Sequence, residues 1–136
     1  MKAKISLITL GVDDLERAKR FYRDGLGLPE YPFDAEDVVF FEMEGSWLSL
    51  FPRDALAADI GLPPQAAASG GFSGITLAHN VASKAEVDAV LQQAVEAGAT
   101  LLKAGQEVFW GGYSGYFQDT EGHYWEVAYN PFKDLS

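Results

Sequence analysis

The tripeptide Ile8-Thr9-Leu10 recurs as Ile75-Thr76-Leu77, and the same order of signals follows each copy. A helix-capping pattern comes next, at Asp13–Glu16 in the first copy and at Ser83–Glu86 in the second, with Glu16 or Glu86 three positions after the capping residue. An amphipathic segment, a glycine stop and runs of β-branched and aromatic residues then follow in both copies. The repeat therefore predicts two halves with the same fold.

Each half is expected to contain one helix and several short strands. The apolar helix faces comprise Leu15, Ala18, Tyr22 and Leu26 in the first half, and Val87, Val90, Leu91, Ala94 and Val95 in the second. Glycines at 25 or 27 and at 98 end the two helices. The expected strands cover 8–10, 29–33, 38–41 and 47–51, then 75–77, 100–102, 113–118 and 124–129.

The two halves are too small to fold alone, because domains of this size bury too little surface. We predict a single domain over 1–136, with repeats at 5–52 and 73–131 joined by a linker at 53–72 that includes a short helical turn. The predicted class is α+β: two βαβββ modules form an open, cup-like mixed sheet with helices outside.

The charge balance narrows the range of partners. The chain of 136 residues carries 10 Lys and Arg against 20 Asp and Glu, a net charge of −10 at pH 7. Such a surface repels nucleic acid and anionic membranes, attracts cationic ligands and also favours solubility. The absence of cysteine excludes thiol chemistry. No export signal or membrane-spanning run is evident, so we expect a cytoplasmic protein.

Four stretches make the sequence resemble the vicinal oxygen chelate superfamily, which includes glyoxalase I, bleomycin-resistance proteins and extradiol dioxygenases. They are Ile8–Gly27, Gly74–Leu77, Gly98-Ala99 and the closing hairpin Tyr116–Val127. The closing turn Asp119-Thr120-Glu121-Gly122 departs from the usual Asp-Pro-Asp-Gly, which a type I turn tolerates. The resemblance implies a small-molecule ligand and a homodimer, and unpaired strand edges favour the dimer as well.

The resemblance also implies four metal-ligand positions, which fall on Leu7, Ser49, Gly74 and Glu126. Only Glu126 is a competent ligand, whereas a hard divalent ion needs several oxygen or imidazole ligands at once. His79 and His123 have the wrong strand parity to complete the set. We expect no resident metal and no cofactor, with weak binding of a divalent ion left open.

Strand alternation separates a predicted ligand face from a core face. The core face comprises Ile8, Leu10, Leu48, Leu50, Ile75, Leu77, Trp125 and Val127. The predicted ligand-binding residues are Thr9, Trp47, Ser49, Phe51, Thr76, Trp110, Tyr113, Ser114, Tyr116, Tyr124 and Glu126. Trp110 and Tyr113 belong to a glycine-rich segment that suits either a flap over a flat ligand or a twisted hairpin.

Three roles stay open for Glu126, the only candidate catalytic residue. Aromatic neighbours would raise its pKa and suit it to act as a general base or acid, and it equally suits a ligand anchor or a structural partner of a tyrosine. The first functional hypothesis is a metal-free protein that binds a small organic molecule, cationic or aromatic. The alternatives are a lyase, isomerase or dioxygenase acting on a small oxygenated substrate, and an interaction module without a ligand.

Overall fold

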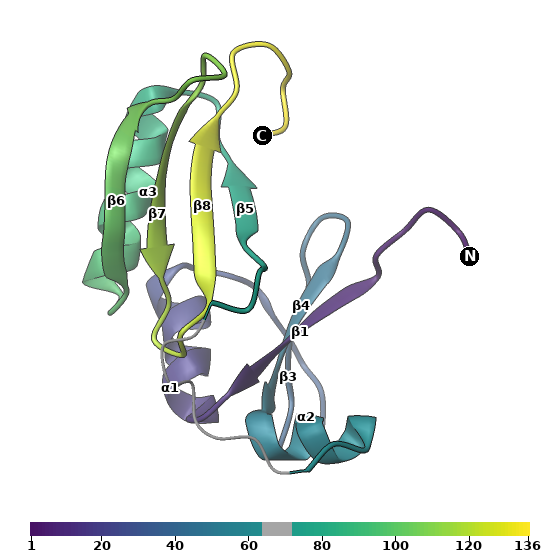
Figure 1. The fold of residues 1–136 in the computed structure, drawn as a ribbon. Coiled ribbons are helices and arrows are strands. Elements are labelled where there is room, and N and C mark those ends of the chain that lie inside the picture. Colours follow the sequence, from purple (N-terminus) through teal and green to yellow (C-terminus); the bar gives the residue numbers. More distant parts are fainter. Residues whose placement is uncertain (64–71) are drawn as a thin grey trace. The chain divides into compact units, whose positions relative to one another are not determined.

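The computed structural model describes residues 1–63 and 72–136 of the chain. The chain divides into two compact units, Met1–Ser69 and Gly70–Ser136, and each unit is described by itself. Both contain a four-stranded mixed sheet (Figure 1). No helix in the described part is long and apolar enough to cross a membrane. The predicted α+β class with two repeated modules is confirmed.

The first unit begins with a strand, a helix and a π-helical turn, followed by three strands and a second helix. The bounds are Leu7–Val12 (β1), Leu15–Arg20 (α1), Phe21–Gly25 (η1), Glu30–Tyr31 (β2), Val39–Phe41 (β3), Trp47–Pro52 (β4) and Arg53–Ile60 (α2). The sheet order is β1-β4-β3-β2, in which β1 runs parallel to β4 and the other pairs are antiparallel. Helix α2 occupies the start of the predicted linker, and residues 64–71 lie outside the described part.

The second unit repeats the order of one strand, one helix and three strands. The bounds are Leu77–Asn80 (β5), Lys84–Glu96 (α3), Thr100–Glu107 (β6), Tyr113–Gln118 (β7) and Tyr124–Tyr129 (β8). The sheet order is β5-β8-β7-β6, and helix α3 covers one face of β6, β7 and β8 (Figure 1). Strands β7 and β8 have the predicted bounds, whereas β6 extends five residues beyond the predicted strand.

The start of α3 is as predicted, and the start of α1 differs by one residue. Ser83 accepts a hydrogen bond from the backbone N–H of Glu86 at 3.2 Å. In the first unit the cap is Asp14, which accepts from the backbone N–H of Arg17 at 2.9 Å, so the assignment to Asp13 was wrong. Asp13 instead pairs with Arg53 Nε at 2.9 Å, which ties the start of α1 to the start of α2.

Each unit has an aromatic core on the helix-facing side of its sheet. In the first unit Tyr22 and Phe41 are fully buried, with ring centroids 6.0 Å apart. In the second unit Phe117 and Trp125 stack at 6.1 Å with an interplanar angle of 5°. Two predicted core residues are exposed: Ile75, because β5 begins only at Leu77, and Val95, which lies at the edge of the buried helix face.

The closing turn of the β7–β8 hairpin is held by one side chain. Asp119 Oδ1 accepts hydrogen bonds from the backbone N–H groups of Glu121 and His123, both at 2.8 Å. Gly122 follows with φ +91°, a conformation that favours glycine. The turn therefore forms without proline, and it pairs Gln118 with Tyr124 across the hairpin.

Candidate functional site

An apolar groove lies within the first unit, and we name it the aromatic groove. It has a volume of about 330 Å³ and is lined by Ser6, Leu7, Tyr31, Phe33, Phe40 and Trp47. The rings of Tyr31 and Trp47 are 4.9 Å apart, and those of Phe33 and Phe40 are 5.1 Å apart in an edge-to-face arrangement. Phe33 is 56% exposed, so this groove presents aromatic surface that the unit itself does not bury.

Strand register explains why these side chains meet. Leu7 of β1 lies opposite Trp47 of β4, and Tyr31 of β2 lies opposite Phe40 of β3. The residues of the other parity, such as Leu48 and Leu50, are buried in the core. Of the groove residues, Trp47 was predicted as a ligand contact, whereas Tyr31, Phe33 and Phe40 were missed. Phe40 alone had a signal in the sequence, namely the hairpin of β3 and β4, because Phe40 lies opposite Ser49.

The predicted hydroxyl contacts of the first unit satisfy each other. Thr9 Oγ1 and Ser49 Oγ are 2.6 Å apart, and Ser49 is only 1% exposed. A buried hydroxyl with a short hydrogen bond has little capacity to bind a ligand without losing that bond. Thr9 and Phe51 remain partly exposed, and neither lines the aromatic groove.

A row of polar side chains crosses the sheet of the second unit, and we name Lys103, Tyr116 and Glu126 the polar row. Tyr116 of β7 lies opposite Glu126 of β8 on one side and opposite Lys103 of β6 on the other. Burial of Tyr116, the charge of Glu126 and a hydrogen bond to its carboxylate all raise the pKa of Tyr116. Tyr116 is therefore the proton donor to Glu126, and a tyrosine partner is one of the three roles that the sequence leaves open for this carboxylate.

The Tyr116–Glu126 pair is expected to make the folding stability depend on pH in the alkaline range. Because the pKa of Tyr116 is raised above its ordinary value of about 10, the unfolded chain loses this proton first, and stability falls as pH rises through that range. Ultraviolet titration of tyrosinate, read as the difference between the wild type and Tyr116→Phe, gives the pKa. In a Glu126→Gln background the pKa of Tyr116 is expected to fall toward its ordinary value of about 10 without reaching it, because the phenol stays partly buried. An unchanged titration would contradict the pairing.

Three predicted ligand residues of the second unit lie elsewhere. Tyr113 faces α3, where its hydroxyl donates to Asp88 Oδ1 at 2.9 Å, because alternation turns it to the opposite face from Ser114 and Tyr116. Trp110 lies in the β6–β7 turn, close to the Cα of Gly112, where a Cβ would be 1.9 Å from the indole ring. Thr76 is exposed and precedes β5.

Two predicted positions sit beside the polar row. Ser114 is 2% exposed and lies opposite Ala128. Tyr124 packs edge to face on Phe72, with ring centroids 5.5 Å apart. The second unit thus brings Tyr116 and Glu126 together as a polar pair, with Tyr124 one residue pair away along the same face.

The four ligand positions implied by the resemblance do not fit a metal ion. Leu7 and Gly74 have no side-chain donor, and the Ser49 hydroxyl is bound to Thr9. Glu126 is the remaining ligand, and its partner is Tyr116. No group of three or more His, Asp or Glu side chains among the described residues is arranged to hold a metal ion.

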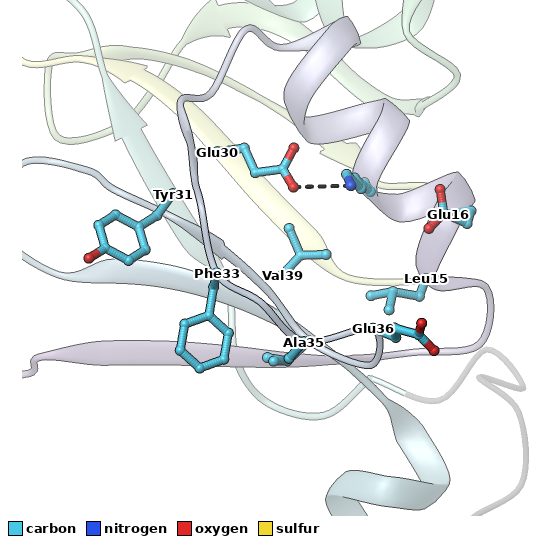
Figure 2. A pocket seen from close by; sticks show the side chains of 10 residues that line it. Leu15, Glu16, Glu30, Tyr31, Phe33, Ala35, Glu36 and Val39 are labelled. Carbon is cyan, nitrogen blue, oxygen red and sulfur yellow. Dashed lines mark ion pairs between the residues drawn. The ribbon is translucent and has the colours of Figure 1, made fainter.

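A second concavity of the first unit lies between α1 and the segment 30–39, and we name it the helix-side pocket. It has a volume of about 260 Å³, and its lining is Leu15, Glu16, Lys19, Glu30, Tyr31, Phe33, Ala35, Glu36, Val38 and Val39 (Figure 2). Glu30 projects toward α1, and Tyr31 projects away from it. The pocket therefore combines an apolar floor with charged walls.

The charges at one wall of this pocket compensate each other. Glu30 accepts from Lys19 Nζ at 3.0 Å and from Arg23 Nη1 at 3.1 Å. Burial opposes ionisation of Glu30, but the hydrogen bonds from the two cations lower its pKa overall. Glu30 is thus an ionised structural carboxylate that ties β2 to α1 and η1. The sequence did not predict this role, because Lys19 and Arg23 are separated from Glu30 by a turn whose geometry the sequence does not determine.

Comparison with known proteins assigns the chain to a family. The model of the Glyoxalase/Bleomycin resistance protein/Dioxygenase superfamily matches residues 4–127. The chain belongs to this superfamily. No curated protein matches it. Among solved structures of the superfamily fold, a glyoxalase-related enzyme from Fulvimarina pelagi is 34% identical, with a TM-score of 0.87 over 98% of this chain and 93% of that chain.

Two further solved structures are similar to this chain at lower sequence identity. A lactoylglutathione lyase from Agrobacterium tumefaciens is 25% identical, with a TM-score of 0.71, and the match covers 100% of both chains. A glyoxalase/bleomycin resistance protein/dioxygenase family enzyme from Burkholderia phytofirmans is 21% identical, with a TM-score of 0.80 over 93% of this chain and 98% of that chain. The latter shows a shared fold alone.

Proposed function

We propose that this protein binds a small organic molecule with a flat apolar part and that it does so without a resident metal ion. The observation that carries the proposal is the aromatic groove, in which Tyr31, Phe33, Phe40 and Trp47 surround about 330 Å³. This volume is at the lower end of the range of about 300–1,000 Å³ that is typical of ligand pockets. Aromatic side chains recognise flat rings by stacking and edge-to-face contacts.

The polar row of the second unit, taken by itself, supports hydrogen bonding to a ligand. The Tyr116 phenol donates to the Glu126 carboxylate, which leaves lone pairs on that carboxylate for a ligand N–H or O–H group. Glu126 is accordingly proposed as a ligand anchor. Membership of the superfamily is consistent with small-molecule binding.

Binding of 2-naphthol, a neutral flat bicycle, tests the proposal. NMR titration of the wild type should shift the Trp47 indole signal and amides of β2, β3 and β4. Trp47→Ala is expected to weaken binding at least tenfold, about 1.4 kcal/mol, because it removes the largest ring of the groove. Trp110→Ala is the matched control, since Trp110 lies outside the groove, and it should leave the affinity unchanged. Equal effects of both variants, or no binding, would contradict the proposal.

A lyase, isomerase or dioxygenase activity on a small oxygenated substrate is the second candidate function. The Tyr116–Glu126 hydrogen bond favours it, because a carboxylate beside a phenol can transfer protons. This activity ranks second, because Leu7 and Gly74 have no metal-ligating side chain. The interaction module without a ligand ranks last, because the aromatic groove is open. A homodimer and a cytoplasmic location stay predictions from the sequence.

A further inference from the structure

We propose that the aromatic groove and the helix-side pocket form one bipartite site for an arylalkylamine, a flat ring joined by a short aliphatic chain to a cationic amine. This inference rests on the proposed function and adds to it the charge and the shape of the ligand. The two cavities share part of their lining: Tyr31 and Phe33 border both. A molecule that reaches past these two rings is therefore in contact with both compartments.

The two compartments differ sharply in chemistry. The lining of the aromatic groove has no charged residue, whereas that of the helix-side pocket has four. Lys19 and Glu30 of those four are already paired with each other. The apolar part of a ligand is therefore favoured in the groove, and a polar end is favoured in the pocket.

The sign of the polar end follows from the remaining carboxylates. Glu16 and Glu36 line the pocket, and neither has an ion pair or a side-chain hydrogen bond with the described residues. Buried Val39 and half-buried Leu15 form apolar surface beside them (Figure 2). An ammonium group on an aliphatic chain matches this combination, because the carbon chain covers the apolar floor while the charge meets the carboxylates. The net charge of −10 favours the approach of such a cation.

A matched pair of probes tests the inference. The probes 4-phenylbutylamine and 4-phenylbutan-1-ol have the same length and ring and differ in the charge at one end. The wild type is expected to bind the amine at least tenfold more tightly than the alcohol, as measured by NMR titration. Amides of α1 and of the segment 33–39 should shift with the amine alone, and groove amides with both probes.

Substitutions then assign the preference to the pocket. The double variant Glu16→Gln/Glu36→Gln should bring the two affinities to within about twofold of each other, because the ammonium group loses both of its ion pairs with these exposed carboxylates. The control Glu42→Gln/Glu44→Gln removes the same charge from exposed positions outside both cavities and should keep the preference. Circular dichroism confirms that each variant is folded.

The outcomes separate this inference from the proposed function. If both probes bind the wild type equally and Trp47→Ala weakens both, the groove is a ligand site and the bipartite inference is wrong. If the two double variants reduce the preference equally, the effect is one of overall charge, and the inference is likewise wrong. If neither probe binds, the proposed function fails together with it.

Discussion

The Gly115→Ala variant is expected to lose about 2–3 kcal/mol of folding free energy in the second unit, because a methyl group has no space there. A Cβ at this position would lie 2.5 Å from Leu91 Cδ1 of α3 and 2.6 Å from the carbonyl oxygen of Lys103. It would also lie 3.0 Å from the backbone nitrogen of Gly105. The helix side chain can rotate, but the two β6 backbone atoms are fixed by pairing with β7. The strand must therefore separate from β6 or from α3.

Urea denaturation followed by circular dichroism measures this effect. Gly11→Ala is the matched control: Gly11 is also a buried strand glycine, but its Cβ would meet its nearest neighbours at 3.5 and 3.6 Å, ordinary contact distances. The control is expected to change stability by less than about 0.5 kcal/mol. Equal stability of the two variants would contradict the tight packing of β6, β7 and α3. The polar row depends on that packing, since Lys103 and Tyr116 are paired across the same two strands.

The Phe41→Ala variant is expected to destabilise the first unit by about 3–5 kcal/mol, the range for removing a buried phenylalanine ring. Phe41 is 0% exposed, and its ring lies 6.0 Å from that of Tyr22, which is also 0% exposed. The cavity would open where η1 packs on β3. Because Phe40 faces the aromatic groove from the same short strand, loss of order in β3 should also weaken 2-naphthol binding.

Phe109→Ala provides the control for this second variant. Phe109 is fully exposed at the tip of the β6–β7 hairpin, so the same substitution there should change the unfolding free energy by no more than about 0.5 kcal/mol. Thermal and urea unfolding of both variants give the comparison. A Phe41→Ala protein as stable as Phe109→Ala would show that the Tyr22–Phe41 contact does not hold the first unit together.

Local sequence signals predicted the elements well where one residue had a clear advantage. Ser83 has a serine-to-glutamate spacing that caps α3, and β7 and β8 have the predicted bounds. The start of α1 offered two adjacent aspartates of equal capping ability. The choice of Asp14 reflects the ion pair of Asp13 with Arg53, a residue 40 positions away, which no local pattern contains.

The site was harder to predict, because it depends on pairing between strands. Alternation along β4 correctly placed Trp47 on an open face, and alternation along β7 placed Tyr116 beside Glu126. Tyr31 belongs to a strand of two residues and Phe33 follows it, and such a strand is too short to show a period. Tyr113 was predicted as a ligand contact from the composition of a glycine-rich segment and not from strand alternation. In the structure its hydroxyl donates to Asp88 instead.

The turn at Asp119 has a consequence for the chemistry several residues away. The two-residue period of a strand means that a hairpin shifted by one position would send every side chain to the opposite face. By fixing Gln118 against Tyr124, the Asp119 carboxylate sets the alignment of the whole ribbon, including the phenol and carboxylate of Tyr116 and Glu126. An insertion or deletion of one residue at this bend would therefore separate the proton donor from its acceptor without altering either of them.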